Sequence, residues 1–303
     1  MPDAKGFWLE ANLNFHARRF ADSIQGDNLK TANTVLAEDD TVNRAGPFKQ
    51  CRWYILGQPN EDDEEVKSAD NLGIVEGLQV NVEYERAVYT ALFLTGVNTA
   101  GEDSEDEVKL PLVCIRMPAA LRSSLSYYMA TIFDTRMEPL LLNSTTICKS
   151  LENFLDECAE DEVSFQKTVK EIQLTLSFNK PISASLKAID VAIRRNDVPG
   201  FLKQGRAINS TSVTNIKSIE GIFMAALQKY LQAHLALKLN ADQVIISRVA
   251  CGAFALGKEG KMKLFSPDAS TDDSSEYDAA AMASRRATAQ VLQIILQTAI
   301  GNT

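Results

Sequence analysis

Residues 77–96, GLQVNVEYERAVYTALFLTG, decide the fold class of this chain. Leu78, Val80, Val82 and Tyr84 alternate with polar side chains, which is the pattern of a strand that buries one face. A second run of β-branched and aromatic residues follows after only the short connection ERA. Two strands joined so closely pair in an antiparallel hairpin, because a parallel pair needs a long crossover.

More strands and a first helix flank this hairpin. The runs CRWYILG (51–57) and PLVCIRM (111–117) have the composition of strands. The earlier stretch NFHARRFADSIQG (14–26) predicts a helix that ends at Gly26. Its apolar residues recur at roughly helical spacing: Phe15, Phe20 and Ile24.

The stretch LPLVCIRMPAALRSSLSYYMATIFDTRMEPL (110–140) raises a choice between a catalytic cluster and a packing helix. Pro118 suits a first helical turn, and Pro139 breaks the helical pattern. One apolar stripe runs along this helix: Leu121, Leu125, Tyr128 and Ile132. We interpret it as a packing helix, because it contains no His or Cys that could serve as base or nucleophile. A second helix, 144–158, follows with Ser144 as its expected cap.

The second half of the chain repeats this order of strands and helices. Residues 169–179 and 185–195 alternate as an antiparallel pair. A very short helix follows, with Asp197 as a candidate cap and Gly205 as a candidate stop. Residues 219–239 form the most strongly helical segment of the chain.

The C-terminal part continues with a hairpin and a long helix. QVIISRVACGAFALG (243–257) and KMKLFSP (261–267) read as strands joined by the turn KEGK. The last helix is expected from about Tyr277 to Ile300.

Together these elements predict an α+β fold made of two consecutive antiparallel β-sheet units, each covered by helices on one face. We expect the N-terminal unit to span residues 1–162 and the C-terminal unit to span residues 163–303. Strict βαβ alternation is absent from the sequence, and so are the nucleotide-binding and hydrolase motifs.

Charge and cysteine usage narrow the functional class. The net charge is −9, but three runs, at 61–65, 102–107 and 156–162, hold 15 of the 40 acidic residues. The rest of the chain has 31 basic and 25 acidic residues, so a basic patch for DNA or a nucleosome is compatible with the composition. The alternative is that the runs are simply hydrated loops. The five widely spaced cysteines predict reduced, mostly buried thiols rather than a disulfide framework, and we expect no metal and no cofactor.

No apolar run is long enough to span a membrane, and the start of the chain lacks a signal pattern. We therefore expect an intracellular protein without a membrane partner. An enzyme would need a site between the two halves, for example from Asp134, Arg136 and His234, although His234 at the margin of an apolar stripe is more typical of a packed histidine. A third possibility is a self-associating scaffold, such as a homodimer, built on the last helix.

A run of phrases along the chain resembles the fungal branch of the centromere protein L family. These phrases, in order, are NFHARRFADSIQGD, FKQCRWYILG, LPLVCIRMPAALRSSLSYYMATIFDTRMEPLLL, VKEIQLTLSF, SLKAIDVAIRRNDVPGFLKQGR, FMAALQKYLQAHLALKL and SRVACGAFALGKEGKMKLF. One departure is that the family starts with a further strand-like segment, so we expect an abbreviated N-terminus or a missing first strand here.

This resemblance implies a non-enzymatic nuclear subunit of the inner kinetochore that supports attachment to centromeric chromatin and chromosome segregation. Its implied partners are a centromere protein N homologue, as a heterodimer, and other inner-kinetochore subunits. Pairing through the C-terminal part points to the hairpin 244–265 and to β-augmentation. The residues expected to bind the partner are Phe254, Leu256, Met262, Leu264 and Phe265. The alternative is that these side chains face the chain's own core.

A chromatin contact would use positive charge rather than base reading, and would be steeply salt-dependent. The residues expected to make it are Arg194, Arg195, Lys203, Arg206, Lys258, Lys261 and Lys263. The alternative is that these charges only keep the surface soluble.

Overall fold

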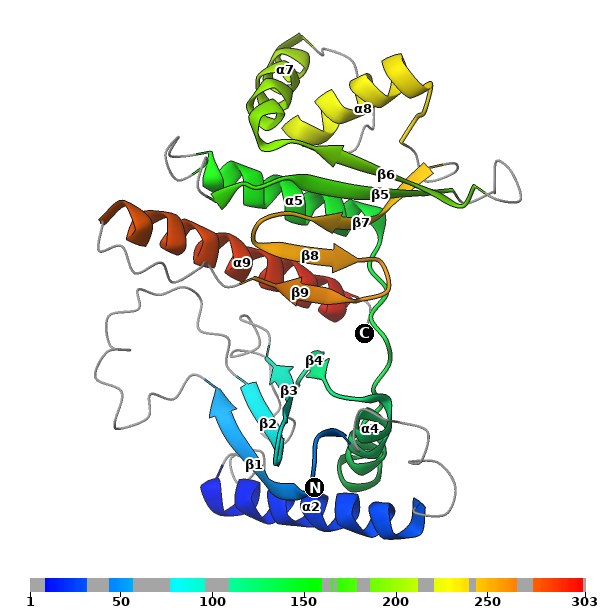
Figure 1. Cartoon of the computed structure of the whole chain (residues 1–303), viewed down its shortest axis with the longest axis vertical. Coiled ribbons are helices and arrows are strands. Elements are labelled where there is room, and N and C mark those ends of the chain that lie inside the picture. The colour runs from blue at the N-terminus through cyan, green and yellow to red at the C-terminus, as the bar shows by residue number, and fades with distance from the viewer. Residues whose placement is uncertain are drawn as a thin grey trace. The chain divides into compact units, whose positions relative to one another are not determined.

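The computed structural model describes residues 9–31, 44–56, 77–95, 109–159, 165, 168–178, 186–211, 221–239, 244–265 and 275–301 (Figure 1). The chain divides into two compact units. The first unit is Met1–Glu138 with Ala299–Thr303, and the second is Pro139–Thr298.

The first unit is built on a four-stranded antiparallel sheet. Its strands are β1 (Phe48–Leu56), β2 (Gly77–Tyr84), β3 (Val88–Leu94) and β4 (Leu112–Arg116), in the order β1-β2-β3-β4. The N–H of Tyr84 donates to the carbonyl of Ala87 at 2.8 Å and closes the β2–β3 hairpin. The hairpin predicted from residues 77–96 is therefore confirmed.

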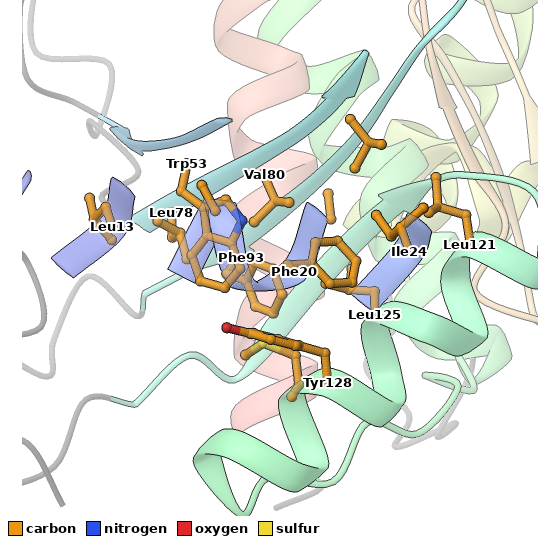
Figure 2. Close-up of a cluster of buried hydrophobic side chains, with 14 of the residues drawn as sticks. Leu13, Phe20, Ile24, Trp53, Leu78, Val80, Phe93, Leu121, Leu125 and Tyr128 are labelled. Carbon is orange, nitrogen blue, oxygen red and sulfur yellow. The ribbon is translucent and has the colours of Figure 1, made fainter. Parts of the chain in front are cut away.

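Helices α2 (Glu10–Thr31) and α4 (Ala119–Phe133) cover one face of this sheet. Figure 2 shows the core that results, in which Phe20 of α2 and Tyr128 of α4 lie beside Trp53 and Phe93 of the strands. The rings of Phe20 and Tyr128 are 5.1 Å apart between centroids. These apolar faces meet because the strand alternation and the helical stripes present their large side chains to the same side.

Three details of the helical predictions in this unit were wrong. Helix α2 does not stop at Gly26 but continues to Thr31, because a single glycine in an open position costs a helix only about 1 kcal/mol. Phe15 is 56% exposed and is not part of the core. Helix α4 ends at Asp134, which adopts a left-handed conformation with φ 52°, well before Pro139.

The second unit contains a five-stranded antiparallel sheet. Its strands are β5 (Ile172–Phe178), β6 (Ala188–Ile193), β7 (Val244–Ala250), β8 (Phe254–Gly257) and β9 (Met262–Leu264). The order β6-β5-β7-β8-β9 makes β6 and β9 the two edge strands. The predicted pairing of β5 with β6 is confirmed, and so is the hairpin that joins β8 to β9. Residues 243–257, expected as one strand, instead form β7 and β8, which pair with each other because the chain turns between Ala250 and Phe254.

The helices of this unit are α5 (Ser144–Cys158), α7 (Val198–Thr211), α8 (Ile222–Leu235) and α9 (Ser275–Gly301), with a 3-10 turn, η4 (Arg195–Asp197), before α7. Helix α5 packs against β7 and α8, and α9 lies beside α5 (Figure 1). Gln290 of α9 donates to Glu157 of α5 at 2.8 Å, and the hydroxyls of Thr298 and Thr146 are 3.5 Å apart.

Several helix limits in this unit also differ from the expectation. The cap of α5 is Asn143, whose side chain accepts from the N–H of Thr146 at 2.7 Å, while Ser144 is the first helical residue. Helix α7 runs through Gly205 to Thr211, and Asp197 lies in η4. Gly205 lies within this helix, where its missing side chain lets the backbone of Ile222 approach closely.

The fold class is α+β, as predicted. The expected unit boundary lay after residue 162, whereas α5 packs with the second unit, whose compact part begins at Pro139. The acidic runs 61–65 and 102–107 lie outside the described residues, and Asp156 and Glu157 of the third run belong to α5 rather than to a loop. None of the helices that the structure describes is long and apolar enough to cross a bilayer.

Candidate partner-binding and chromatin-binding surfaces

Phe254 and Leu256, two of the five residues expected to bind a partner, lie in the core of the second unit. Phe254 is fully buried, and its ring packs edge-on against Phe154 of α5 at 5.7 Å between centroids. Leu256 is 1% exposed. The alternative interpretation therefore holds for these two side chains, which stabilise this chain itself.

The edge strand β9 carries two further members of the set, and the fifth, Phe265, follows it and is half-buried. Met262 is half-buried, and Leu264 is 38% exposed. In the β8–β9 ladder these two residues face Leu256 and Phe254, so they extend the core face of the sheet to its edge. The apolar surface of the sheet thus continues to the last strand, where it is only partly covered.

The hydrogen-bonding pattern of β9 orients its main chain. The N–H of Phe265 donates to the carbonyl of Ala253 at 2.8 Å. Antiparallel pairs alternate between bonded and non-bonded residues, so Lys263 also faces β8, whereas the main-chain groups of Met262 and Leu264 point away from it. No further described strand pairs with β9 on that outer side.

The basic residues near this hairpin are exposed but have neighbours of their own. The Lys261 ammonium lies 2.7 Å from the Glu259 carboxylate, and Lys263 lies over the ring of Phe265 at 4.9 Å from its centroid. The carbonyl of Lys258 accepts from the N–H of Leu142 at 2.9 Å, which ties the turn to the segment before α5. Part of the positive charge of this turn is therefore already compensated.

The other four predicted chromatin residues gather around the start of α7. Arg194 and Arg195 lie at η4, and Lys203 and Arg206 are one turn apart on α7; all four side chains are exposed. Residues three apart in a helix share a face, so Lys203 and Arg206 form one basic strip. The structure thus brings these four residues onto neighbouring segments.

A buried carboxylate that the sequence analysis did not single out lies in α5, against the start of α8. Glu152 of α5 is 5% exposed, and it accepts from the backbone N–H of Met224 at 2.6 Å and of Phe223 at 3.2 Å. Burial raises the pKa of Glu152, while these backbone hydrogen bonds oppose the rise. The local sequence of α5 gives no signal for this role, because the two donors are more than 70 residues away.

The residues named for an enzymatic alternative do not form a site within either unit. Asp134 and Arg136 follow α4 in the first unit, where Arg136 pairs with Glu138 at 2.6 Å on the surface. His234 lies in the last turn of α8 in the second unit, with its ring 4.4 Å from that of Tyr230. The side chain is exposed, so the expectation of a packed histidine was wrong. Within the parts of the chain that the structure covers, no group of His, Cys, Asp and Glu could hold a metal ion.

The three cysteines of the second unit are buried, as expected, whereas Cys51 and Cys114 of the first unit are only half-buried. Burial raises the pKa of Cys148 and Cys158 to about 12 and that of Cys251 to about 11. A thiol with such a pKa stays protonated at neutral pH and is a poor nucleophile and metal ligand.

The apolar face of the last helix is also occupied within the chain. Ala287, Val291 and Ile295 of α9 are buried, and the helix makes the contacts with α5 described above. A scaffold that self-associates through this face would first have to detach α9 from its own unit.

Comparison with known proteins identifies the family. The model of the family described as Centromere protein L matches residues 5–300, nearly the whole chain. No curated protein matches the chain. The family match confirms the resemblance seen in the sequence, while the fungal branch stays a prediction. The chain therefore belongs to the centromere protein L family and is a kinetochore component that acts at centromeres in the nucleus.

Proposed function

We propose that the chain is a non-enzymatic subunit of the inner kinetochore that pairs with a centromere protein N homologue through the β9 edge. The observation that carries this proposal is the outward direction of the Met262 and Leu264 main-chain groups on an edge strand. A partner strand that bonds to these groups would extend the sheet by one strand.

The side chains around this edge suit such a pairing. Met262 and Leu264 present partly exposed apolar surface on the core face, and Phe265 follows them. A partner strand at β9 would cover this surface and bury it together with its own apolar side chains. Main-chain hydrogen bonds would supply affinity, and the side chains of Met262, Leu264 and Phe265 would supply specificity.

The test uses a proline that blocks the outer side of β9 only. In Leu264→Pro the N–H that points away from β8 is lost, while the bonds between β8 and β9 are kept. Leu264→Val is the matched control, because it keeps the N–H and most of the apolar side chain. Each variant is mixed with the centromere protein N homologue and measured by size-exclusion chromatography with light scattering.

We expect the wild type and Leu264→Val to form a one-to-one complex and Leu264→Pro to elute as free chain. Thermal unfolding of the free variants checks that Leu264→Pro remains folded. A complex that forms equally well with the folded Leu264→Pro chain would place the interface elsewhere.

We further propose that the second unit contacts centromeric DNA or the nucleosome through Arg194, Arg195, Lys203 and Arg206. These four exposed cations lie on η4 and α7, and backbone binding needs such charge rather than base-specific geometry. Lys258, Lys261 and Lys263 would contribute less, because Lys261 pairs with Glu259 and Lys263 lies over Phe265.

The four cations can be tested together by replacing them with glutamate. The salt-sensitive retention of the chain on immobilised DNA should then be lost. The control exchanges four other exposed cations of the same unit, so that the change in net charge is identical: Lys149, Lys170, Lys229 and Lys238. Retention that falls equally in both variants would mean that net charge alone, rather than this surface, holds the DNA.

A further inference from the structure

Helix α5 presents two carboxylates, one turn apart, to the helical hairpin formed by α7 and α8. Glu152 and Asp156 are separated by four residues and therefore lie on the same side of α5. Glu152 is buried and holds the start of α8, whereas Asp156 is exposed. The two side chains thus meet the hairpin in different ways.

Glu152 acts as a helix cap supplied from another helix. Helix α8 has no side-chain cap of its own, since its first position is preceded by Gly221. The carboxylate of Glu152 takes over this role by accepting from the free N–H groups of Phe223 and Met224. Gly221 permits this approach because it has no side chain: a Cβ at this position would collide with the Glu152 carboxylate. Its φ of 140° is also one that other residues rarely adopt.

The start of α8 also lies close to the basic strip of α7. Gly205 lies against the backbone of Ile222, so the two helices approach each other closely where α8 begins. Arg206 is the next residue after Gly205 and belongs to the strip with Lys203. Partial burial raises the pKa of the Asp156 carboxyl, and the charge of the Arg206 guanidinium opposes part of this rise.

We propose that α5 controls the basic surface of α7 through these two carboxylates with opposite effects. Glu152 positions the hairpin that carries Lys203 and Arg206, and Asp156 neutralises part of the charge of Arg206. The proposal rests on the chromatin contact proposed above, and it deepens that contact by naming the residues that set its strength.

Two readouts separate the two carboxylates. Hydrogen exchange at the amides of Phe223 and Met224 reports the cap directly, and the salt concentration that elutes the chain from immobilised DNA reports the surface. Glu152→Ala should speed exchange at both amides at least about tenfold, since they lose their acceptor, and should lower the eluting salt concentration. Glu152→Gln keeps one acceptor oxygen and should restore slow exchange at one of the two amides, which also keeps the test valid if Glu152→Ala does not fold.

Asp156→Asn should have the opposite effect on DNA. It leaves exchange at Phe223 and Met224 unchanged, and it should raise DNA affinity about twofold to threefold, because Arg206 no longer has a competing carboxylate.

The possible results distinguish a failure of the role proposed for α5 from a failure of the proposed chromatin contact. Unchanged exchange in Glu152→Ala overturns the positioning role of Glu152. Equal or weaker DNA binding in Asp156→Asn, with the fourfold glutamate variant still defective, overturns the role of Asp156. If the fourfold glutamate variant binds DNA like the wild type, the proposed chromatin contact is wrong. The hydrogen-exchange data then still test the capping role of Glu152, because they do not depend on DNA.

Discussion

The Nδ1 of His16 lies 3.1 Å from the phenolic oxygen of Tyr128, and this contact joins α2 to α4 inside the first unit. The His16 ring also stacks on Trp53 at 5.8 Å and contacts Phe133 at 4.9 Å between centroids. Such surroundings favour the neutral imidazole, because an imidazolium among aromatic rings would lose much of its hydration.

This environment predicts a pH dependence of stability. Burial, and secondarily the charge of Arg19, lowers the pKa of His16 from its usual 6.5. The unfolded chain therefore binds the proton first, so the contribution of His16 is complete above pH 6.5 and is lost as the pH falls below it. We expect the free energy of unfolding from urea titrations to decline between pH 7 and pH 5.

The variant His16→Gln, whose side chain can still hydrogen-bond to Tyr128, should remove the part of the decline in unfolding free energy between pH 7 and pH 5 that His16 causes. The other histidine of the chain, His234, lies exposed in α8 and provides the control. If His234→Gln flattens the slope and His16→Gln does not, the assignment to His16 is wrong.

Gly221 should be intolerant of a side chain. Its φ of 140° and the adjacent Glu152 carboxylate both exclude a Cβ, so Gly221→Ala should destabilise the second unit by at least about 2 kcal/mol. Gly200→Ala is the matched control, because nothing lies within 4 Å of its Cβ position in α7. Thermal unfolding should show a lower Tm for Gly221→Ala and an equal or higher Tm for Gly200→Ala.

Substitutions of a buried and of an exposed residue in the C-terminal hairpin should have different effects on stability and on partner binding. Phe254→Ala should cost about 3–5 kcal/mol of stability, because a fully buried ring is removed from its contact with Phe154. Leu264→Ala should cost less than about 1 kcal/mol in the free chain but weaken partner binding. Urea unfolding and a binding titration measure the two effects. A large stability loss in Leu264→Ala would mean that β9 is needed for the core rather than for a partner.

The cap of α5 offers a prediction about local structure. Asn143→Ala should lower stability by about 1 kcal/mol, because the N–H of Thr146 loses its acceptor. Asn143→Asp keeps an acceptor at the same place and should retain most of the stability. Equal losses in both variants, measured by Tm, would contradict a capping role.

The strands could be predicted from the sequence because their signal is local. In residues 78–84 each buried side chain alternates with a less buried one, and the connection to β3 is too short for any other pairing. The stripe of α4 was predictable for the same reason, since Leu121, Leu125 and Tyr128 are all buried.

The helix limits could not be predicted so well, because a glycine can either end a helix or lie within it. Gly26 and Gly205 read as stop signals, yet the first lies in open space within a continuing helix and the second permits a close helix contact. Only the neighbouring helix α8 distinguishes these cases, and the sequence around Gly205 holds no information about it.

The candidate sites show the same division. The hairpin 244–265 was predictable as a pair of strands, but the burial of Phe254 against α5 depends on a helix almost 100 residues away. Alternation alone predicts which residues share a face, not which face a helix covers. Glu152 could not be recognised at all, because a polar residue in a helix usually faces water.

The most direct test of the central claim is light scattering on a size-exclusion column, with the chain alone and then with the centromere protein N homologue of its own organism. The account predicts a stable one-to-one complex that persists at moderate salt, since apolar burial and main-chain bonds at β9 hold it. Separate elution of the two proteins at both low and moderate salt would contradict the account.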